Sequence, residues 1–471
     1  MESFCQTVSP PSSVQAANKP AFHRRSIKPE RFLALGFFLL IVAGGFVLTL
    51  PVSSADGRTV GIRQAMFSAT SAVCVTGLSI VDVGVELSFF GQAVLLMLIQ
   101  VGGLGFMAFA TLIMVALGRR ISLRDRMILR DAMNQDALSG MVRLTLAFFL
   151  IALVVELCGA LLLMTRLIPL YGPARGVWQS LFTSVSAFCN AGFDLFGGYR
   201  SLTHLQNEPV ILLTLGGLIL VGGLGFPVIL ECLGARFRWR KLPLHAKLVL
   251  TVTAGLIAFG TLSILALEWD NPRTLDGGLT VWQKLYNSLF QSITFRTAGF
   301  ASLDQASLTD PSKLIGSVLM FVGTSSASTG GGVKTTTAAL LALVVVQVVR
   351  GHERITVFKR EISADTARRA VAIVLIAFSA ILIATCVISV IERGRGHDFL
   401  DLLFETTSAF STTGLSSVNT PTLTPAAQGL LMPLMYFGRV GPLTLAYALA
   451  NRLESRRANR VHYPEEKIMI G

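Results

Sequence analysis

Four short segments of this chain can be superimposed on a single glycine. Each begins with Phe, runs through Ser, Thr and Ala, and ends with Gly followed by Leu or Phe: FSATSAVCVTGLS (67–79), FTSVSAFCNAGFD (182–194), FQSITFRTAGFAS (290–302) and FETTSAFSTTGLS (404–416). The glycines recur at intervals of 115, 107 and 115 residues, and they are Gly77, Gly192, Gly299 and Gly414. This period predicts one structural unit repeated four times.

An apolar stretch lies on each side of every segment. The chain is 52% hydrophobic and only 14% charged, which is too few charges for an ordinary soluble domain. Eight stretches reach the roughly 20 residues that a membrane-spanning helix needs. They are 32–51, 88–117, 143–165, 208–234, 247–268, 312–350, 370–391 and 426–450. We therefore expect an all-α polytopic membrane protein with eight full membrane helices.

The basic residues mark one side of the membrane. The net charge of +13 would also suit a nucleic-acid-binding protein, but 26 of the 40 Lys and Arg lie in short strips beside apolar stretches. These strips are 19–31, 119–130, 236–247, 350–369 and 452–467. By the positive-inside rule they face the cytoplasm, together with both chain termini. No basic face on a soluble domain is predicted, so no nucleic-acid partner is expected.

The other connections are long, poor in Lys and Arg, and contain the four aligned segments, so they should lie outside. They are 52–87, 166–207, 269–311 and 392–425. Each unit then holds two full crossings and its successor starts on the same side, which makes the repeats parallel. Parallel repeats argue against the inverted repeats of most secondary transporters.

Each aligned segment is too short and polar to span, but its first ten or so residues could form a half-helix that enters the membrane and returns as extended chain. Non-helical backbone at that depth must be buried in protein or line a water-filled cavity. Four such segments around one axis would form a ring of carbonyls that replaces the water shell of a cation. One such glycine alone is better explained as a turn or a helix C-cap, but four matching copies favour the ring.

The expected limits of the units follow from these patterns. We expect a disordered cytoplasmic N-terminal tail (1–30), repeat 1 (31–118), repeat 2 (141–235), repeat 3 (244–350) with an intramembrane loop (323–335), repeat 4 (366–451) and a cytoplasmic C-terminal tail (452–471).

The stretch 312–350 should break inside the membrane. Each Gly costs about 1 kcal/mol relative to Ala in a helix, and Ser and Thr compete for backbone hydrogen bonds. The residues responsible are Gly323, Thr324, Ser325, Ser326, Ser328, Thr329, Gly330, Gly331 and Gly332. A phosphate-binding loop is not expected, because Val333 rather than Gly precedes Lys334. A kink that only assists packing is the remaining alternative, and the GGLGF motifs at 102–106 and 222–226 are interpreted as close helix packing.

Three basic residues fall at membrane depth. Arg439 should cost on the order of 3 kcal/mol at the bilayer centre, so it must face the protein interior, with a functional role or a structural pairing to Glu405 or loop carbonyls. Lys334 is a second intramembrane cation. Arg296 lies inside an aligned segment and should point away from a conduction path, where it would repel cations.

Acidic residues lie at or shortly after the ends of three of the aligned segments. Asp82, Asp194 and Asp304 could concentrate cations at an outer mouth, or each could be ordinary surface charge.

With these features the chain resembles the Trk/Ktr/HKT superfamily of potassium transporters over roughly residues 30–455. The resemblance rests on the four one-glycine segments and on GTSSASTGGGVKTTT (323–337). It implies four covalently linked M1–P-loop–M2 repeats, with eight full helices and four pore half-helices in a potassium-channel-like arrangement of pseudo-fourfold symmetry. The first unit starts directly at Leu33, so the chain looks closer to the Ktr membrane subunit than to the longer Trk subunit.

The resemblance also implies roles for individual residues. The selectivity filter would comprise Val75, Thr76, Gly77 and Leu78; Cys189, Asn190, Ala191, Gly192 and Phe193; Arg296, Thr297, Ala298, Gly299 and Phe300; and Ser411, Thr412, Thr413, Gly414 and Leu415. The loop 323–335 would be a gate under the filter, with Lys334 in it and Arg439 against it. In HKT relatives a Ser at the first of these glycines accompanies sodium selectivity, so four glycines favour potassium, although each segment has one glycine and not the two of TVGYG.

The family further implies a cytosolic nucleotide-binding regulatory subunit of the RCK type, a homodimer in the cytoplasmic membrane, and no cofactor in this chain besides the transported K⁺, with Na⁺ dependence left open. The alternatives are a secondary cation transporter with alternating access and a less selective Na⁺/K⁺ pathway. An enzyme is not expected, because the apolar stretches contain no paired carboxylates, HExxH or nucleophile constellation.

Overall fold

A computed structural model gives the fold of the protein. It describes residues 29–105, 108–109, 111–112, 115, 141–351, 355–357 and 360–441. The regular secondary structure in these ranges is helical apart from one antiparallel hairpin, formed by β1 (Ile355–Val357) and β2 (Arg360–Ile362). The all-α expectation is corrected only there. The expected tails lie almost entirely outside the described residues, as do the whole basic strip 119–130 and the end of the stretch 426–450.

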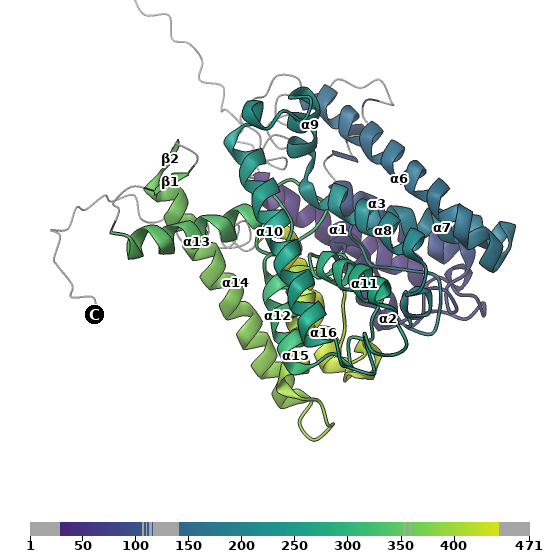
Figure 1. Ribbon diagram of the computed structural model, residues 1–471. Helices are drawn as coiled ribbons and strands as arrows, with labels where there is room; N and C mark the ends of the chain where they lie inside the picture. The colour runs from purple at the N-terminus through teal and green to yellow at the C-terminus, as the bar shows by residue number, and fades with distance from the viewer. Residues whose placement is uncertain are drawn as a thin grey trace, which may run out of the picture.

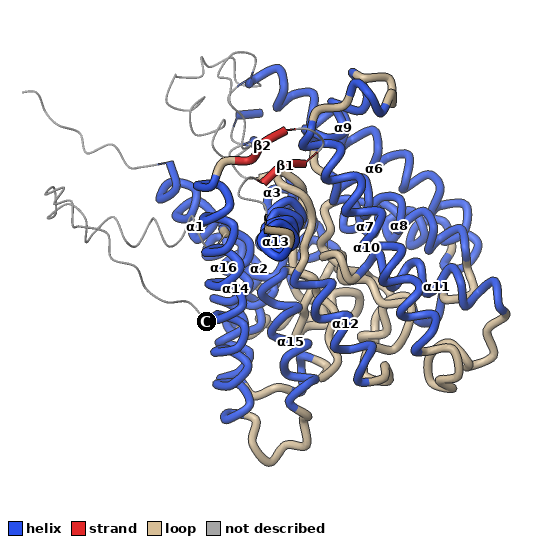
Figure 2. Tube along the Cα trace, turned by 60° about the vertical axis from the view of Figure 1, so that its left-hand side comes forward, coloured by secondary structure: helices blue, strands red, loops and turns tan. Residues whose placement is uncertain are grey.

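Four long apolar helices form the periphery of the molecule (Figures 1 and 2). They are α1 (Pro29–Thr49), α6 (Met141–Tyr171), α10 (Leu244–Leu267) and α14 (Ala364–Ile391). Each is long and apolar enough to cross a membrane, and only 22% to 33% of each span is buried inside the protein. Large side chains such as Phe46, Leu262 and Val390 are at least 66% exposed. Apolar helices with exposed apolar faces are those of a protein surrounded by lipid.

A short helix follows each long one and lies inside the molecule. These helices are α2 (Ile62–Cys74), α7 (Pro173–Phe188), α11 (Val281–Thr294) and α15 (Phe399–Ser411). The Phe that opens each aligned segment lies on them and is at most 2% exposed; the four are Phe67, Phe182, Phe290 and Phe404. Their Ser and Thr side chains are also buried, so these helices are neither surface nor lipid-facing elements.

Each long helix, its short helix and the helix that follows form one group. The third helix of each group is too short to cross a membrane on its own. These helices are α3 (Phe89–Leu104), α8 (Pro209–Leu224), α12 (Asp310–Phe321) and α16 (Pro425–Val440). The chain bends by 93° between α8 and α9 (Phe226–Gly234), so the expectation of an uninterrupted crossing at 208–234 is wrong. After α12 the chain is non-helical from 322 to 334, and α13 (Thr335–Val349) follows. Counting α8 with α9, up to five spans in the described part are long and apolar enough, and the expected crossings at 88–117 and 426–450 continue into residues outside it.

The groups pack in a closed cycle. Helix α3 contacts α7, α8 contacts α11, α12 contacts α15, and α16 returns to α2 and α1. Side chains in the first turns of three of these helices bond the next short helix. Trp178 Nε1 donates to Gln92 Oε1 at 2.8 Å, Lys313 pairs with Asp401 at 2.7 Å, and Arg63 donates to Gln428.

Two glutamates at the ends of long helices cap the helices that follow the short ones. Glu268 accepts from Thr309 N at 2.9 Å, at the start of α12. Glu392 accepts from Thr424 N at 2.8 Å, at the start of α16. The first backbone N–H groups of a helix have no partner within it, so a buried carboxylate is a suitable acceptor.

The two ends of the molecule differ. Helix α9 and the hairpin β1–β2 lie at the top of both views, whereas the connection between α14 and α15 lies at the bottom (Figures 1 and 2). Short 3-10 turns punctuate the connections; they are η1 (Pro51–Ser53), η2 (Thr203–Leu205), η3 (Trp239–Lys241) and η4 (Thr420–Thr422).

Candidate functional site

The four aligned segments share one backbone geometry. The residue two before each glycine has a left-handed backbone, with φ of 57° at Val75, 59° at Asn190, 60° at Thr297 and 52° at Thr412. The glycines follow with φ between 70° and 96°. Non-glycine residues seldom adopt positive φ, and β-branched ones such as Val and Thr least of all. The same strained turn at four matching positions indicates that the local structure is repeated together with the sequence.

The four glycines form a ring. A Cβ added to Gly77 would lie 2.6 Å from the Ala191 carbonyl oxygen, and one added to Gly192 would lie 2.8 Å from that of Ala298. A Cβ on Gly299 would lie 2.6 Å from the Thr413 oxygen, and one on Gly414 would meet the Thr76 oxygen. Each glycine therefore faces the carbonyl that precedes the next glycine, and the fourth closes on the first. A side chain at any of these positions would collide with backbone.

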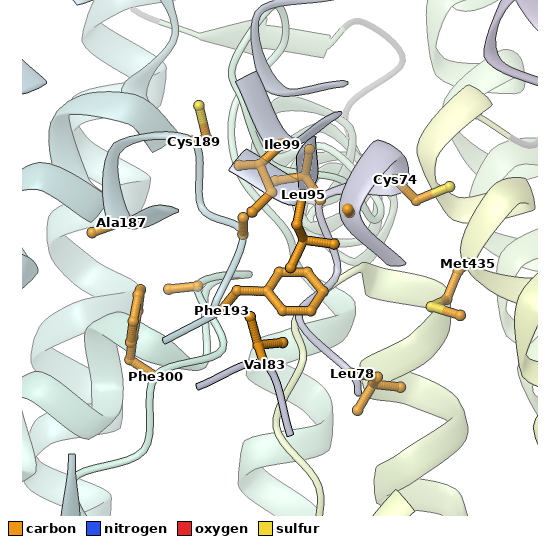
Figure 3. Packing of buried hydrophobic residues seen from close by; sticks show 14 of the residues in the cluster. Cys74, Leu78, Val83, Leu95, Ile99, Ala187, Cys189, Phe193, Phe300 and Met435 are labelled. Carbon is orange, nitrogen blue, oxygen red and sulfur yellow. The ribbon is translucent and has the colours of Figure 1, made fainter. Parts of the chain in front are cut away.

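Hydroxyl groups of the short helices hold this ring. Gly77 N donates to Ser71 Oγ at 3.1 Å, and Gly414 N donates to Ser408 Oγ at 3.0 Å. In the third segment Thr294 Oγ1 donates to the Phe300 carbonyl at 2.6 Å. The residue after each glycine is buried behind the ring; these residues are Leu78, Phe193, Phe300 and Leu415, and Figure 3 shows the first three.

Several buried polar atoms of these segments lack a hydrogen-bond partner among the described residues. They are the hydroxyl oxygens of Thr76, Thr297, Ser411, Thr412 and Thr413 and the amide nitrogen of Asn190. Buried polar atoms are normally paired, because an unpaired one costs about 1–3 kcal/mol. Unpaired oxygens gathered at a narrow ring are suited to water or a cation.

The non-helical stretch between α12 and α13 lies directly against the ring. Thr329 Oγ1 donates to the Phe188 carbonyl at 3.2 Å and lies 3.2 Å from Asn190 Oδ1. A Cβ on Gly331 would lie 2.9 Å from Thr412 Cγ2, and one on Gly332 would lie 3.4 Å from Ser411. The stretch also bonds α8, since Ser325 N donates to the Gly223 carbonyl at 3.1 Å.

Arg296 holds the base of this stretch. Its guanidinium donates to the Gly323 carbonyl at 3.3 Å and to Thr335 Oγ1 at 2.9 Å, which are the two ends of the loop. Thr335 Oγ1 itself donates to Gly323 at 2.8 Å. The Arg296 side chain is 4% exposed and points toward the loop base.

Arg439 holds the tip of the loop. Its guanidinium donates to the carbonyls of Thr329, Gly102 and Gly103, the last at 3.2 Å. Lys334 Nζ donates to the Gly330 carbonyl at 2.8 Å. The alternative pairing of Arg439 with Glu405 is wrong, because Glu405 accepts from Thr420 Oγ1 at 2.7 Å instead. Within the described residues, no carboxylate lies within 4.0 Å of either cation.

Three further glycines share a structural role that the sequence analysis did not predict. Gly105, Gly225 and Gly441 follow α3, α8 and α16 with φ of 89°, 86° and 94°. The GGLGF motifs therefore do two things. Their first glycines allow close packing, since a Cβ on Gly102 would meet the Val73 carbonyl and one on Gly222 the Phe188 carbonyl, whereas the last glycine ends the helix.

A cavity of about 340 Å³ opens on the other side of the ring. Its lining includes all four ring glycines and Asp82, Asp194 and Asp304. Asp194 accepts from Phe196 N at 3.0 Å and Asp304 from Ser307 Oγ at 2.6 Å. Burial raises the pKa of Asp194 to about 6, and the charge of Asp82 acts in the same direction. Carboxylates here favour a positively charged occupant.

A closed ring of carbonyls between an acidic cavity and an adjoining loop, inside a protein with helices long and apolar enough to cross a membrane, fits the class of cation-transport proteins. The family model described as "TrkH: Cation transport protein" matches residues 28–461. The chain belongs to this family, which is one of transporters and not of enzymes.

Similar proteins agree with this assignment. The Ktr system potassium uptake protein B of Bacillus subtilis is 38% identical, over 94% of this chain and 97% of that protein. The potassium/sodium uptake protein NtpJ of Enterococcus hirae is 37% identical, over 95% of this chain and 98% of that protein. The crystal structure of the potassium transporter TrkH from Vibrio parahaemolyticus has the same fold, with a TM-score of 0.70 and 18% identity over 91% of this chain and 86% of that chain.

Proposed function

We propose that this protein takes up potassium ions through a channel-like pore whose narrowest part is the glycine ring. The observation that carries the proposal is the closed order of contacts from Gly77 through Gly192 and Gly299 to Gly414 and back. Backbone carbonyls arranged this way replace the water shell of a cation. The unpaired hydroxyls of Thr76 and the neighbouring residues add oxygens of the right kind.

In this proposal four parallel M1–P-loop–M2 repeats surround the pore with pseudo-fourfold symmetry. Three observations support it: the common left-handed turn, the buried Phe at the same place in each short helix, and the cycle of helix contacts that closes on α1 and α2. Because the repeats are one chain, the four quarters can differ, as Cys189, Arg296 and Ser411 do at matching positions.

Potassium is the proposed ion because the Bacillus subtilis relative is named for potassium uptake and all four ring glycines are present. The Enterococcus hirae relative is named for potassium and sodium, and each segment has one glycine. A less selective Na⁺/K⁺ pathway, or Na⁺-dependent K⁺ uptake, is therefore the second candidate.

The loop 323–335 is proposed as the gate. It lies against the ring on the side away from the acidic cavity, and two cations, Lys334 and Arg439, are bonded to its carbonyls without a nearby carboxylate among the described residues. A fixed positive charge beneath the ring raises the barrier to cations until the loop moves.

The acidic cavity is then the outer mouth, and the end with α9 and the hairpin faces the cytoplasm, as the basic strips predict. This orientation places both termini in the cytoplasm and the apolar peripheral helices in the lipid of the cytoplasmic membrane. We further propose a homodimer and an RCK-type nucleotide-binding subunit at the cytoplasmic end. Exposed valines at the end of α13, Val348 (71%) and Val349 (82%), offer apolar surface for a partner there.

Growth of a potassium-uptake-deficient bacterium in low potassium tests the proposal. The wild-type chain, Gly77→Ser and a deletion of 324–332 would be expressed alone and with a cognate RCK-type subunit. We expect rescue by the wild type, weaker rescue and more sodium entry with Gly77→Ser, and faster uptake with the deletion. Rescue that is indifferent to Gly77→Ser, or no rescue with the subunit supplied, would contradict the pore assignment.

A further inference from the structure

A buried carboxylate lies behind the second quarter of the ring. Glu156 is near the middle of α6, and its side chain is 3% exposed. Its two carboxylate oxygens each lie 3.1 Å from Gln100 Nε2 on α3. Ser184 on α7 donates to the Glu156 backbone carbonyl at 2.6 Å. Glu156 on α6 is thus held by α3 through its side chain and by α7 through its backbone.

This carboxylate is linked to the ring through one residue. Cys189 Sγ donates to Gln100 Oε1 at 3.4 Å and lies 4.0 Å from Glu156 Oε1. Cys189 is the residue three before Gly192, and Figure 3 shows its thiol pointing away from Phe193. Glu156 is therefore next to the wall of the cation path and not at the lipid surface.

Each of four other carboxylates in the interior has a contact that explains it structurally. Glu268 and Glu392 cap helices, Asp401 pairs with Lys313, and Glu405 takes a threonine hydroxyl. Glu156 has one amide donor, and in the described part of the chain no Lys, Arg or His lies within 4.0 Å of it. A glutamine would satisfy the same amide contact, so packing alone does not require an acid here.

We propose that Glu156, when ionised, supplies a negative charge behind the second aligned segment and that its counter-ion is the cation passing through the ring. The inference rests on the proposed potassium pathway. Burying a carboxylate in the membrane is costly unless a positive charge lies nearby. At low effective dielectric a unit charge next to the ring wall attracts a cation more strongly than a surface charge does. Glu156 is thus an affinity-determining residue, and Gln100 is the residue that positions it.

The position of Glu156 also gives neighbouring quarters of the ring different electrostatic surroundings. The residue three before the glycine is Cys189 in the second quarter, backed by Glu156, and Arg296 in the third. One quarter carries an anion behind its wall and the next carries a cation that holds the loop. A cation in the ring is therefore drawn toward the second quarter.

The test compares Glu156→Gln with the swap Gln100→Glu/Glu156→Gln in purified protein reconstituted into liposomes. Rubidium influx would give the apparent KM and the maximal rate separately. We expect Glu156→Gln to raise the KM by about threefold to tenfold with a smaller change in maximal rate. The swap returns the charge to the same pair of side chains, so it should restore most of the KM.

Two comparisons keep the outcome interpretable. Glu268→Gln, a buried carboxylate that caps α12, should lower abundance and leave the KM unchanged. If Glu156→Gln is abundant and its KM equals that of the wild type, the inference is wrong while the pore assignment stands. A KM raised equally by Glu156→Gln and the swap would also overturn it, because geometry and not charge would then be the cause. If the wild type transports no rubidium, the proposed function itself fails.

Discussion

The guanidinium of Arg296 and the hydroxyl of Thr335 are joined by a hydrogen bond of 2.9 Å, which ties a ring segment to the start of α13. Because Arg296 also bonds Gly323, one side chain spans both ends of the loop 323–335. The ring and the loop beneath it are therefore parts of one bonded structure.

Arg296→Gln should loosen the base of the loop. Hydrogen bonds to a charged group are worth about 1.5–3 kcal/mol each, so the thermal midpoint should fall and basal flux should rise. Arg296→Lys keeps the charge, so its thermal midpoint and its basal flux should lie between those of Arg296→Gln and the wild type. Labelling of a cysteine at Ser328 by a small thiol reagent, before and after each substitution, checks whether the loop becomes more accessible. Unchanged labelling would show that Thr335 and Gly323 hold the loop without Arg296.

Gly77→Ala should block the ring. The added Cβ would lie 2.6 Å from the Ala191 oxygen at a backbone φ of 96°. Strain of about 1–3 kcal/mol at such a site should reduce potassium flux by about tenfold or more. Gly217→Ala on α8 is the matched control, since nothing lies within 4 Å of the position of its Cβ. Equal flux in the two variants would contradict the ring.

If the loop is the proposed gate, Arg439→Gln should speed basal flux, because the loop tip loses a charged donor to Thr329 and the positive charge beneath the ring is removed. Flux into liposomes without any partner subunit is the measurement. Arg63→Gln, which alters an arginine at the rim between α2 and α16, should leave that basal flux unchanged. Slower flux in Arg439→Gln would mean that the arginine assists conduction.

Lys313 and Asp401 form a largely buried pair between α12 and α15. Asp401→Asn should destabilise the protein by about 3 kcal/mol, because the buried ammonium loses its partner. The double variant Lys313→Met/Asp401→Leu should be closer to the wild type in stability, since no buried charge is left without a partner. Thermal unfolding in detergent compares the three. A double variant less stable than the single one would show that the pair contributes more than its desolvation costs.

The raised pKa of Asp194, about 6, predicts a pH dependence with opposite signs for stability and uptake. A carboxyl whose folded pKa lies above its ordinary value of 3.8 binds its proton more tightly in the folded state. Its contribution to stability is therefore present below about pH 4 and is lost as the pH rises toward 6. Uptake should instead fall as the external pH drops through 6, because the mouth loses a negative charge.

Asp194→Asn should remove this pH dependence, and Asp304→Asn should retain it. Rubidium influx between external pH 7.5 and 5.5 is the assay for both variants. The same slope in Asp194→Asn as in the wild type would show that a group other than Asp194 causes the pH dependence.

Much of this architecture was predictable because its signals are local and repeated. The period of the glycines, the apolar stretches and the family resemblance gave the class of protein, and the Gly, Ser and Thr content of 323–332 pointed to a broken helix. The 93° bend at Gly225 was missed, because GGLGF also suits ordinary helix packing inside an apolar run.

The partners of the buried charges could not be predicted. Arg439 reaches Gly102, 337 residues away, and Glu156 meets Gln100, 56 residues away, and no pattern in one sequence connects them. Glu156 itself is the one carboxylate in the apolar middle of α6, and no sequence motif surrounds it. The role of Glu156 depends on which helices pack against α6, and this is set by the whole fold and not by the local sequence.

The dipoles of the four short helices contribute to the electrostatic potential at the ring. All four end at the ring, and the loop touches their last residues, as Thr329 does at Phe188. Each C-terminus carries a partial charge of about −0.5 from the aligned peptide dipoles, so four sum to about −2. Arg439 and Lys334 together carry the opposite charge in the same place. If the ring is the proposed potassium pathway, an ion that leaves it competes with Arg439 and Lys334 for the same negative region, so that occupancy of the ring and displacement of the loop are coupled by charge.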